Sequence, residues 1–374
     1  MRNVDAAGLG IGDDYPTRIM GVLNVSKESP YDPSVFEDPG EAAEYVDREL
    51  IDEGADIVDV GLESANKDFE VLSAEGELER LETAVETIES VSGDAVFSIE
   101  TRYHEVAEAA LDAGFDMVND ICGFADPEMP RVCEEYDVAV GKMASPPDLE
   151  RPGAVEDVDD IYDALALNGL TDKTIVDPAF GGWSEAKTLQ DDRETFERLR
   201  EFRGYGLPML VSINRKNFLR DLAGRDTDEA LPVSLAATAM AIERGAHVVR
   251  THDVAETLDA AKVGDRFTPD RVRDTGAGVE ELDVRTPGDA GRHLDRTGAE
   301  ADPEAATTRV FELSALSEAE HAALGDLAAA HPGVEVAAGP DGTLLFGTVA
   351  ALRAAARAAD GPVGRRLDAV AEGL

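Results

Sequence analysis

The segment EGADIVDV, residues 53–60, decides how the chain is expected to fold. Its first half resembles a helix end, with a glycine just after the last turn, and its second half is an apolar run typical of a buried strand. The same arrangement returns as AGFDMVND at residues 113–120 and as RGAHVVRT at residues 244–251. A helix that leads directly into a strand, repeated along the chain, predicts a parallel sheet with alternating helices.

Short apolar runs of this kind occur eight times between residues 18 and 267, with helical patterns between them. Near-continuous hydrophobicity is typical of parallel strands that are covered on both faces. Eight strand–helix units in succession predict a closed (β/α)8 barrel, a TIM barrel, and favour it over an open doubly wound sheet. The predicted strands are Ile19–Val25, Ile57–Gly61, Val96–Glu100, Met117–Ile121, Val138–Lys142, Thr174–Asp177, Met209–Ser212 and Val248–His252.

The chain has 374 residues, more than the about 250 that one barrel needs, so a second small domain is expected. Residues 268–304 are rich in Asp, Arg, Gly and Thr and show little apolar periodicity, which predicts a linker after a barrel domain over residues 1–267. Residues 305–374 predict a small α/β appendage whose role the sequence does not indicate. Its predicted elements are a strand at Arg309–Ser314, a helix at Glu318–Ala330, strands at Val334–Ala338 and Thr343–Val349 around the turn GPDG, and a helix at Ala350–Ala359.

Charge is the most extreme property of the composition. Asp and Glu total 79 against 34 Lys and Arg, which gives a formal net charge of −45. Such a surface excludes nucleic acids and anionic membranes as partners, because phosphate binding needs clustered Lys and Arg. The acidic residues are spread along the whole chain rather than gathered in a disordered tail, and lysine occurs only seven times. This pattern favours a protein adapted to a cytoplasm of high salt, where charge repulsion is screened within a few ångströms.

Two cysteines, Cys122 and Cys133, are too few for a disulfide framework, and no histidine pattern supports a zinc site, so both are expected to be buried. The N-terminus lacks a basic segment followed by an apolar run, and no apolar stretch approaches the length of a membrane span. These absences lead us to expect a cytoplasmic protein without a membrane anchor.

In a (β/α)8 barrel the functional groups come from the C-terminal ends of the strands and from the loops that follow them. The chain places many polar side chains there, although a buried charge is costly unless it is paired or used. Asp120 and Asp253 are better explained as caps of the following helices, and capping is also an alternative for Glu100 and Asp177. The polar residues at this rim are Asn24, Glu63, Ser64, Glu100, Thr101, Asn119, Asp120, Lys142, Asp177, Asn214, Arg215, Lys216, Arg250, His252 and Asp253.

One set of rim residues suits a fused heterocycle that carries several hydrogen-bond donors and acceptors. Glu100, Asn119 and Asp177 offer carboxylate and amide groups, and a carboxylate accepts two parallel hydrogen bonds from a guanidine-like edge. Lys216 is singled out because lysine is so rare in this chain.

A second set suits a phosphate or pyrophosphate. Arg250 and His252 are two residues apart on a predicted strand, so both side chains point to the same face. Asn24 adds an amide oxygen at the end of the first strand, and Mg²⁺ prefers oxygen ligands while keeping several waters. The loops after the seventh and eighth strands are a common phosphate-binding place in this fold.

At these residues the chain resembles dihydropteroate synthase, a family of the pterin-binding barrel superfamily. The resemblance covers roughly residues 18–267 and rests on six segments in the family's order and spacing. These are GVLNVSKESPYDPSVF (21–36), EGADIVDVGLES (53–64), VND (118–120), DPAFGG (177–182), INRKNF (213–218) and VVRTHDVAET (248–257).

The resemblance implies a transferase that joins 6-hydroxymethyl-7,8-dihydropterin pyrophosphate to p-aminobenzoate and releases pyrophosphate. It implies that Glu100, Asn119, Asp177 and Lys216 hold the pterin, and that Asn24 contacts Mg²⁺ and the pyrophosphate. Arg250 and His252 would hold the leaving pyrophosphate, and with Lys216 they are the expected catalytic residues. It also implies a homodimer formed through barrel helices.

Four departures from the family pattern leave the pterin and pyrophosphate subsites intact but alter the loops that receive the aminobenzoate. Glu100 stands where the family has Asp, and Asn214 stands where the family has Ser. Ala65–Asn66 replaces the family's Thr-Arg, with Lys67 as a substitute cation, and the loop after Asp177 carries extra residues. The acceptor side, predicted to include Ser64, Lys67 and Asn214, therefore leaves open whether p-aminobenzoate or a related aryl amine is used.

Two other functions remain as alternatives on the sequence alone. The same barrel in pterin-binding methyltransferases holds a methylated folate or methanopterin, but such a domain needs no pyrophosphate subsite. A non-catalytic paralogue that binds a pterin is the other alternative, and the altered segment 65–67 is its best support.

Overall fold

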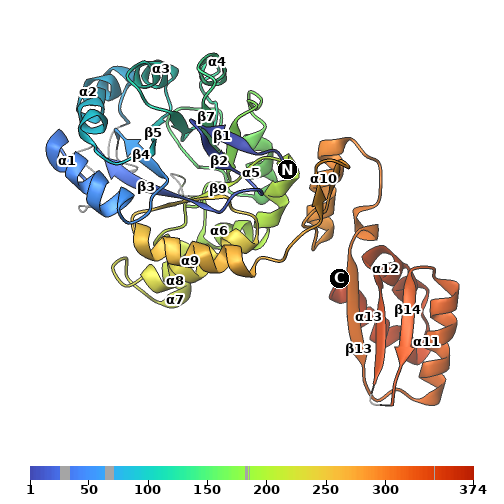
Figure 1. Cartoon of the computed structure of the whole chain (residues 1–374). Helices are drawn as coiled ribbons and strands as arrows, with labels where there is room; N and C mark the ends of the chain where they lie inside the picture. Colours follow the sequence, from blue (N-terminus) through green and yellow to red (C-terminus); the bar gives the residue numbers. More distant parts are fainter. Residues whose placement is uncertain (26–33, 64–70, 182–183, 185, 341) are drawn as a thin grey trace. The chain divides into compact units, whose positions relative to one another are not determined.

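The computed structural model describes residues 1–25, 34–63, 71–181, 184, 186–340 and 342–374. The chain divides into two compact units, Met1–Asp270 and Arg271–Leu374. In Figure 1 the first unit runs from blue to yellow and the second unit is orange to red. In the described part of the chain, no helix combines the length and the apolar character that crossing a membrane requires.

The described part of the first unit contains one sheet of eight parallel strands, in the order β8-β7-β6-β5-β4-β3-β10-β9. The sheet closes on itself, because the backbone N–H of Val176 in β8 donates to the carbonyl of Pro208, 2.9 Å away, just before β9. The predicted (β/α)8 barrel is confirmed, and the open doubly wound sheet is excluded. The strands are β3 (Arg18–Asn24), β4 (Ile57–Gly61), β5 (Val96–Thr101), β6 (Met117–Asp120), β7 (Ala139–Met143), β8 (Thr174–Asp177), β9 (Leu210–Val211) and β10 (Val248–Thr251).

Helices surround the barrel as an outer ring (Figure 1). Their starts follow local capping rules: Ser73 accepts from the N–H of Gly76 at the start of α2, and Thr188 and Asp191 form a reciprocal capping box at the start of α6. The helical segments are α1 (Pro39–Tyr45), a π-helix over Val46–Ile51, α2 (Ala74–Ser90), α3 (His104–Asp112), α4 (Met129–Glu135), α5 (Val158–Leu165), α6 (Leu189–Glu197), a 3₁₀ segment over Leu199–Tyr205, α7 (Asn217–Ala223), α8 (Leu231–Glu243) and α9 (Val254–Phe267).

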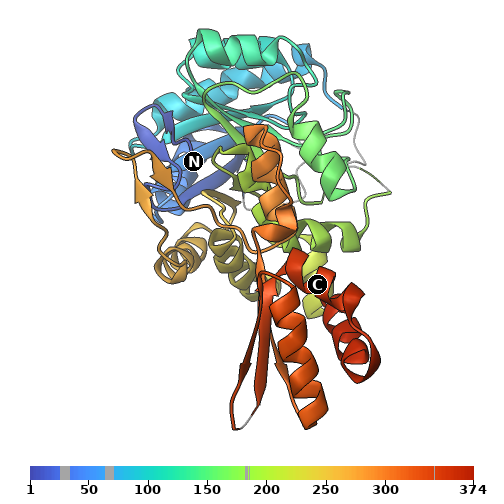
Figure 2. The same cartoon turned by 90° about the vertical axis from the view of Figure 1, so that its right-hand side faces the viewer.

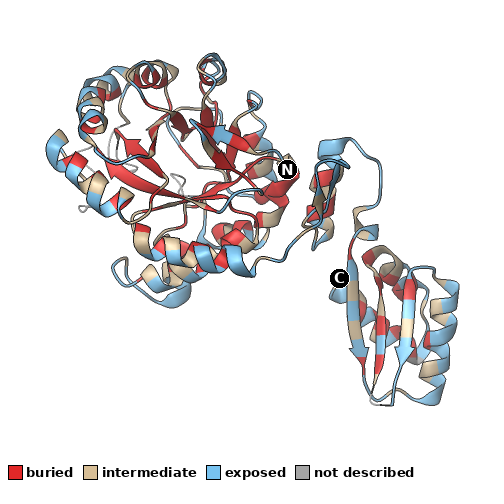
Figure 3. Ribbon diagram, viewed as in Figure 1, coloured by how far each residue is buried: buried red, intermediate tan, exposed pale blue. Residues whose placement is uncertain are grey.

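A hairpin that the sequence analysis did not predict covers the N-terminal end of the barrel. It consists of β1 (Val4–Ala6) and β2 (Leu9–Ile11), which pair antiparallel. Its apolar side chains join a buried layer to which every barrel strand contributes one residue, and the strands are buried along most of their length (Figure 3). This end is therefore an apolar floor. The layer contains Met20, Ile57, Val96, Met117, Ala139, Ile175, Leu210 and Val248.

The second unit is a small α/β structure. Its three-stranded antiparallel sheet has the order β13-β15-β14, and its helices cover one face, as Figure 2 shows. The predicted helix at Glu318–Ala330 is present, but α13 was not predicted. The expected linker contains a small hairpin and a helix. The sequence did not predict them, because the strands are short and the segment is polar. The elements are β11 (Arg273–Asp274), β12 (Val279–Glu280), α10 (Pro287–Thr297), a 3₁₀ turn over Pro303–Ala305, β13 (Thr308–Leu313), α11 (Glu318–Ala330), β14 (Val334–Ala338), β15 (Thr343–Thr348), α12 (Val349–Ala358) and α13 (Gly361–Glu372).

Candidate active site

A cavity of about 150 Å³ lies at the C-terminal ends of the barrel strands. Five of the residues predicted from the sequence line it, and they come from five different strands or the loops after them. Apolar side chains complete its wall, among them Ile121, Met143 and Phe180. The predicted residues that meet here are Glu100, Asn119, Asp177, Lys216 and Arg250.

Arg250 crosses the interior of the barrel and pairs with two carboxylates. Its Nε donates to Oδ2 of Asp59 at 2.7 Å, and its Nη2 donates to Oε2 of Glu100 at 2.6 Å. Burial alone would lower the pKa of Arg250, but the two carboxylates raise it above its usual value. Burial likewise raises the pKa of Glu100, while Arg250 opposes that shift. The guanidinium is therefore a fixed, fully charged group on the cavity wall.

Asp59 is the residue that the sequence analysis missed. It lies in the middle of β4, is fully buried, and accepts from Nδ2 of Asn119 at 2.9 Å as well as from Arg250. Its other oxygen, Oδ1, has no hydrogen-bond partner among the described residues. The signal was available: a carboxylate inside an otherwise apolar strand, in register with the inward positions 57 and 61, costs too much unless it is paired.

Lys216 and Asp177 bring two further ionisable groups to the cavity wall. Oδ1 of Asp177 accepts from the N–H of Ala179 at 2.8 Å, and burial raises the pKa of this carboxyl to about 6, so it is ionised at pH 7. Burial and the nearby Arg250 lower the pKa of Lys216, while Asp177 opposes that shift. No hydrogen bond or ion pair to a described residue holds the Lys216 ammonium, so it is available to a ligand.

Three glycines let the site side chains come close to the backbone. A Cβ at Gly141 would lie 2.9 Å from Oδ1 of Asn119, and one at Gly61 would lie 3.1 Å from Oδ1 of Asn24. Gly181 has a positive φ of 76° and faces the Lys216 side chain. A larger residue at Gly141 or Gly61 would press on these amide oxygens, and one at Gly181 would have to adopt a left-handed conformation that side chains disfavour.

Asn24 and His252 lie at the rim rather than on the cavity wall. Nδ2 of Asn24 donates to Oγ of Ser34 at 2.9 Å, which fixes the amide and leaves its oxygen beside Gly61. Burial and the positive charge of Arg250 lower the pKa of His252 to about 3, so its imidazole is neutral at pH 7. His252 therefore offers a hydrogen bond rather than a charge.

The remaining predicted rim residues have other places. Lys142 points away from the cavity: its ammonium donates to the carbonyls of Leu167 and Gly169, because its neighbour Gly141 occupies the inward position of β7. Nδ2 of Asn214 donates to Asp253 at 2.9 Å, and Asn214 does not line the cavity. Ser64 and Lys67 lie outside the described residues.

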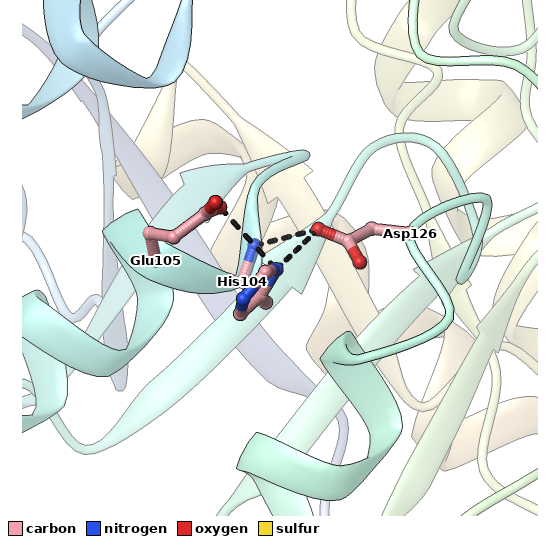
Figure 4. A group of neighbouring side chains, drawn as sticks. All are labelled: His104, Glu105 and Asp126. Atoms are coloured by element: carbon pink, nitrogen blue, oxygen red, sulfur yellow. Dashed lines mark hydrogen bonds and ion pairs between the residues drawn. The ribbon is translucent and has the colours of Figure 1, made fainter.

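A separate cluster of His104, Glu105 and Asp126 lies at the start of α3 (Figure 4). Oδ2 of Asp126 accepts from the backbone N–H of His104 at 3.0 Å and contacts its Nδ1 at 2.7 Å, while Oδ1 accepts from the N–H of Glu128. Asp126 thus joins the first turn of α3 to the loop after β6. These contacts account for the cluster as a helix-start arrangement without a metal ion.

The comparisons with known proteins agree with the site. Residues 20–252 match a family described as pterin binding enzymes. The chain is 33% identical over 256 residues to the dihydropteroate synthase of Clostridium beijerinckii, and the match covers 67% of this chain and 93% of that protein. A dihydropteroate synthase from Thermus thermophilus, solved in complex with 4-aminobenzoate, is similar in structure with a TM-score of 0.58 and 28% identity, covering 71% of this chain and 100% of that one.

A relative from Haloferax volcanii is also similar. The Haloferax volcanii protein named as a probable bifunctional folylpolyglutamate synthase/dihydropteroate synthase is 36% identical over 293 residues, covering 72% of this chain. The match covers 34% of that protein, so the chain spans about a third of its length.

Fold and cavity together define a barrel enzyme that handles a pterin, and the chain belongs to the pterin-binding enzyme family. The relatives reported above carry the name dihydropteroate synthase, and the methyltransferase alternative is not favoured.

We expect Asp59→Asn to destabilise the barrel strongly, because Arg250 would keep only one buried counter-charge. Breaking a buried ion pair costs about 3–5 kcal/mol, and the asparagine oxygen that remains places the expected loss near the lower end. Chemical unfolding in concentrated KCl measures it. Asp172→Asn removes a carboxylate that is 97% exposed in its ion pair with Arg2 and serves as the control, with a loss below about 1 kcal/mol. Equal losses of unfolding free energy in the two variants would contradict the role of Asp59 as a buried counter-charge of Arg250.

We also expect His104 to make stability depend on pH. Burial lowers its pKa, but the hydrogen bond with Asp126 and the nearby carboxylate charges together outweigh burial, so the folded-state pKa lies above the usual 6.5. The contribution of the ion pair is therefore complete below pH 6.5 and is lost as the pH rises through the raised pKa. Relative to the wild type, His104→Gln should lose about 1 kcal/mol at pH 6 and less at pH 9, measured by thermal unfolding. A difference that does not change with pH would refute this.

Proposed function

We propose that the protein is a dihydropteroate synthase-type transferase of folate-type cofactor biosynthesis. It condenses 6-hydroxymethyl-7,8-dihydropterin pyrophosphate with p-aminobenzoate or a related aryl amine and releases pyrophosphate. The observation that carries the proposal is a single cavity in which Asp177 and Lys216 face the buried Arg250–Glu100 pair. Few folded proteins place this many ionisable groups around so small a space without using them.

The pterin ring would lie in the cavity between the polar groups and the apolar wall. Asp177, ionised at pH 7, accepts hydrogen bonds from the guanidine-like edge of the pterin, and Asn119 and Lys216 contact the other polar atoms of the ring. Phe180 and Met143 offer apolar contact to the ring faces. This division matches a flat heterocycle with polar edges.

The reaction breaks the bond between the pterin methylene carbon and the pyrophosphate oxygen, and the amine nitrogen forms the new bond to that carbon and loses a proton. Positive charge that develops on the methylene and the ring is stabilised by the Glu100 carboxylate. Arg250 and the neutral His252 stabilise the departing pyrophosphate, whose negative charge grows as the bond breaks. No covalent intermediate with the protein is needed.

Mg²⁺ is part of the proposal, and the residues present fit it. Asn24 is fixed through its Nδ2 by Ser34, so its amide oxygen is the atom left for a ligand, next to the Glu100 carboxylate across Gly61. Oxygen donors of this kind suit Mg²⁺, which keeps several waters and binds substrate phosphates. When bound, the ion would supply positive charge to the pyrophosphate.

The acceptor amine is the open part of the substrate pair. Its side of the site is proposed to include Ser64, Lys67 and Asn214, and the departures from the family pattern at residues 65–67 and at Asn214 fall on this side. The 4-aminobenzoate complex of the Thermus thermophilus relative supports p-aminobenzoate as the first amine to test.

Two properties of the whole protein are proposed with this function. The net charge of −45 and the similarity to a Haloferax protein support a cytoplasmic enzyme adapted to high salt. Exposed apolar side chains on three neighbouring helices, α7 to α9, support pairing with a second copy of the chain to form a homodimer. They are Leu222, Met240, Val263 and Phe267.

The activity test uses the full chain in concentrated KCl with the pterin pyrophosphate, p-aminobenzoate and Mg²⁺, and measures pyrophosphate release. Lys216→Met and Arg250→Met should each lower kcat/KM by about 100-fold or more, because each removes a group that faces the changing charge. Lys262→Met, which alters an exposed lysine of α9, should leave the rate unchanged. If the wild type releases no pyrophosphate with p-aminobenzoate or with any substituted aniline, the transferase proposal is wrong and the non-catalytic alternative holds.

We expect the temperature of unfolding to rise between dilute buffer and molar KCl. The cause is screening: the Debye length falls to about 3 Å at 1 M salt, which weakens the mutual repulsion of the 79 acidic side chains. Differential scanning calorimetry in KCl measures the shift, and a nonionic osmolyte at the same osmolality is the control. An equal shift with the osmolyte, or none with KCl, would overturn the proposal of high-salt adaptation.

A further inference from the structure

The loops after β9 and β10 each carry a proposed site residue next to a charged residue, and the two charged neighbours have opposite signs. Lys216 follows Arg215 in the first loop, and Asp253 follows His252 in the second. The two strands are parallel neighbours in the barrel, with Val211 beside Val249. Lys216 and His252 are therefore set by two adjacent loops, and what joins the loops decides how the two residues sit.

Arg215 and Asp253 join the loops through a two-pronged ion pair. Nε of Arg215 donates to Oδ2 of Asp253 and Nη2 donates to Oδ1, both at 2.8 Å. The two side chains are 13% and 12% exposed, so water screens the pair little. A bidentate guanidinium–carboxylate pair fixes orientation as well as distance, which a single contact does not.

Arg215 is also tied to the segment before α8. Its Nη1 donates to the carbonyls of Thr227 at 2.7 Å and Asp228 at 3.0 Å, and its backbone N–H donates to Oγ of Ser234 at 2.8 Å. The residue has a φ of 52°, a left-handed conformation that is unfavourable for a side chain of this size. A strained backbone of this kind persists where its surroundings over-determine it, as these bonds do.

Asp253 is not used as a helix cap, although it precedes the first residue of α9. Its side chain accepts no hydrogen bond from the helix start. The N–H of Ala255 in the first turn instead donates to Oε2 of Glu53 at 3.3 Å. Expecting Asp253 to cap the following helix was therefore wrong. Its carboxylate serves Arg215 and Asn214 instead.

We propose that the Arg215–Asp253 ion pair is a positioning pair that holds Lys216 and His252 in their working orientation for the transfer reaction. The inference rests on the proposed function, since it concerns the geometry of that site. Neither Arg215 nor Asp253 lines the cavity, so neither touches the pterin directly. Their effect passes through the two neighbouring residues, where a displacement of about 1 Å is enough to slow a reaction about 100-fold.

The test compares the pair with an ion pair of similar burial at the other end of the barrel. Arg203 donates to Oδ2 of Asp13 at 2.9 Å, and the two side chains are 4% and 10% exposed. Arg203→Lys removes the same guanidinium geometry far from the cavity. It should lower stability while leaving kcat within about twofold of the wild type.

Asp253→Asn and Arg215→Lys should each lower kcat by about 10- to 100-fold. The free energy of unfolding of each variant should differ little from that of Arg203→Lys. The double variant should be no slower than the slower single variant, because the two residues act as one unit. Asp253→Glu keeps the carboxylate and should recover part of the rate lost in Asp253→Asn. These outcomes separate positioning from a general loss of stability, which Arg203→Lys reports.

Wild-type kcat in both single variants, at the stability of Arg203→Lys, would overturn the proposal. Additive losses in the double variant would do the same. If the wild type itself shows no turnover, the proposed function fails, and the pair is then tested by titrating 6-hydroxymethyl-7,8-dihydropterin calorimetrically. Asp253→Asn should then weaken its binding about 10-fold relative to Arg203→Lys, and equal affinities would sink the positioning role independently of catalysis.

Discussion

The buried carboxylate of Asp59 is the constraint on which the upper half of the barrel depends. A charge in the middle of a strand, away from water, is tolerable only with a counter-charge and hydrogen bonds around it. Arg250 supplies the charge and Asn119 supplies a donor, so three strands, β4, β6 and β10, are joined through one oxygen atom. Glu100 extends the same group to β5 through the second prong of Arg250. Because the buried Asp59 carboxylate needs these partners, it brings the side chains of the site together.

The two ends of the barrel have different roles: the N-terminal end stabilises the fold, and the C-terminal end carries the candidate active site. Its floor is an apolar layer with a hairpin beneath it, and every barrel strand contributes one apolar side chain to that layer. Two residues further along several of the strands the side chains become polar, as Ile57 is followed inward by Asp59 and Val248 by Arg250. Because strand side chains alternate between faces, this change from apolar to charged can be seen in the sequence between residues that are two positions apart. The packing of the apolar floor offsets the energetic cost of the buried charges at the rim.

This spacing explains which features could be predicted and which could not. β4 and β8 were predicted with the bounds they have, since each is a short apolar run that follows a polar turn containing a glycine. Glu100, Asn119, Asp177, Lys216 and Arg250 could be brought together because a barrel places all strand ends at one rim. Asp59 was missed because attention to strand ends overlooks a charge inside a strand. Lys142 was misplaced for a related reason: its one-residue offset from Gly141 turns it outward. The hairpin β1–β2 has strands of three residues, too short for any periodicity to be detected.

The two cations of the site differ in how firmly the protein holds them, and the difference fits the chemistry proposed for each. Arg250 is held by two carboxylates before any substrate arrives, so its charge is in place where negative charge grows as pyrophosphate leaves. Preorganised charge of this kind needs no rearrangement when the bond breaks. The Lys216 ammonium is held by no described ion pair, and its place is set instead by the backbone of a loop that Arg215 and Asp253 hold. A buried ammonium without a protein partner is stabilised more by a ligand than one that is already paired, because the ligand's acceptor atoms compensate for the cost of burying the charge. The site thus combines one cation that is stabilised for the leaving group with one that is left available to recognise the pterin, and the second depends on a rigid loop because no side chain fixes it directly.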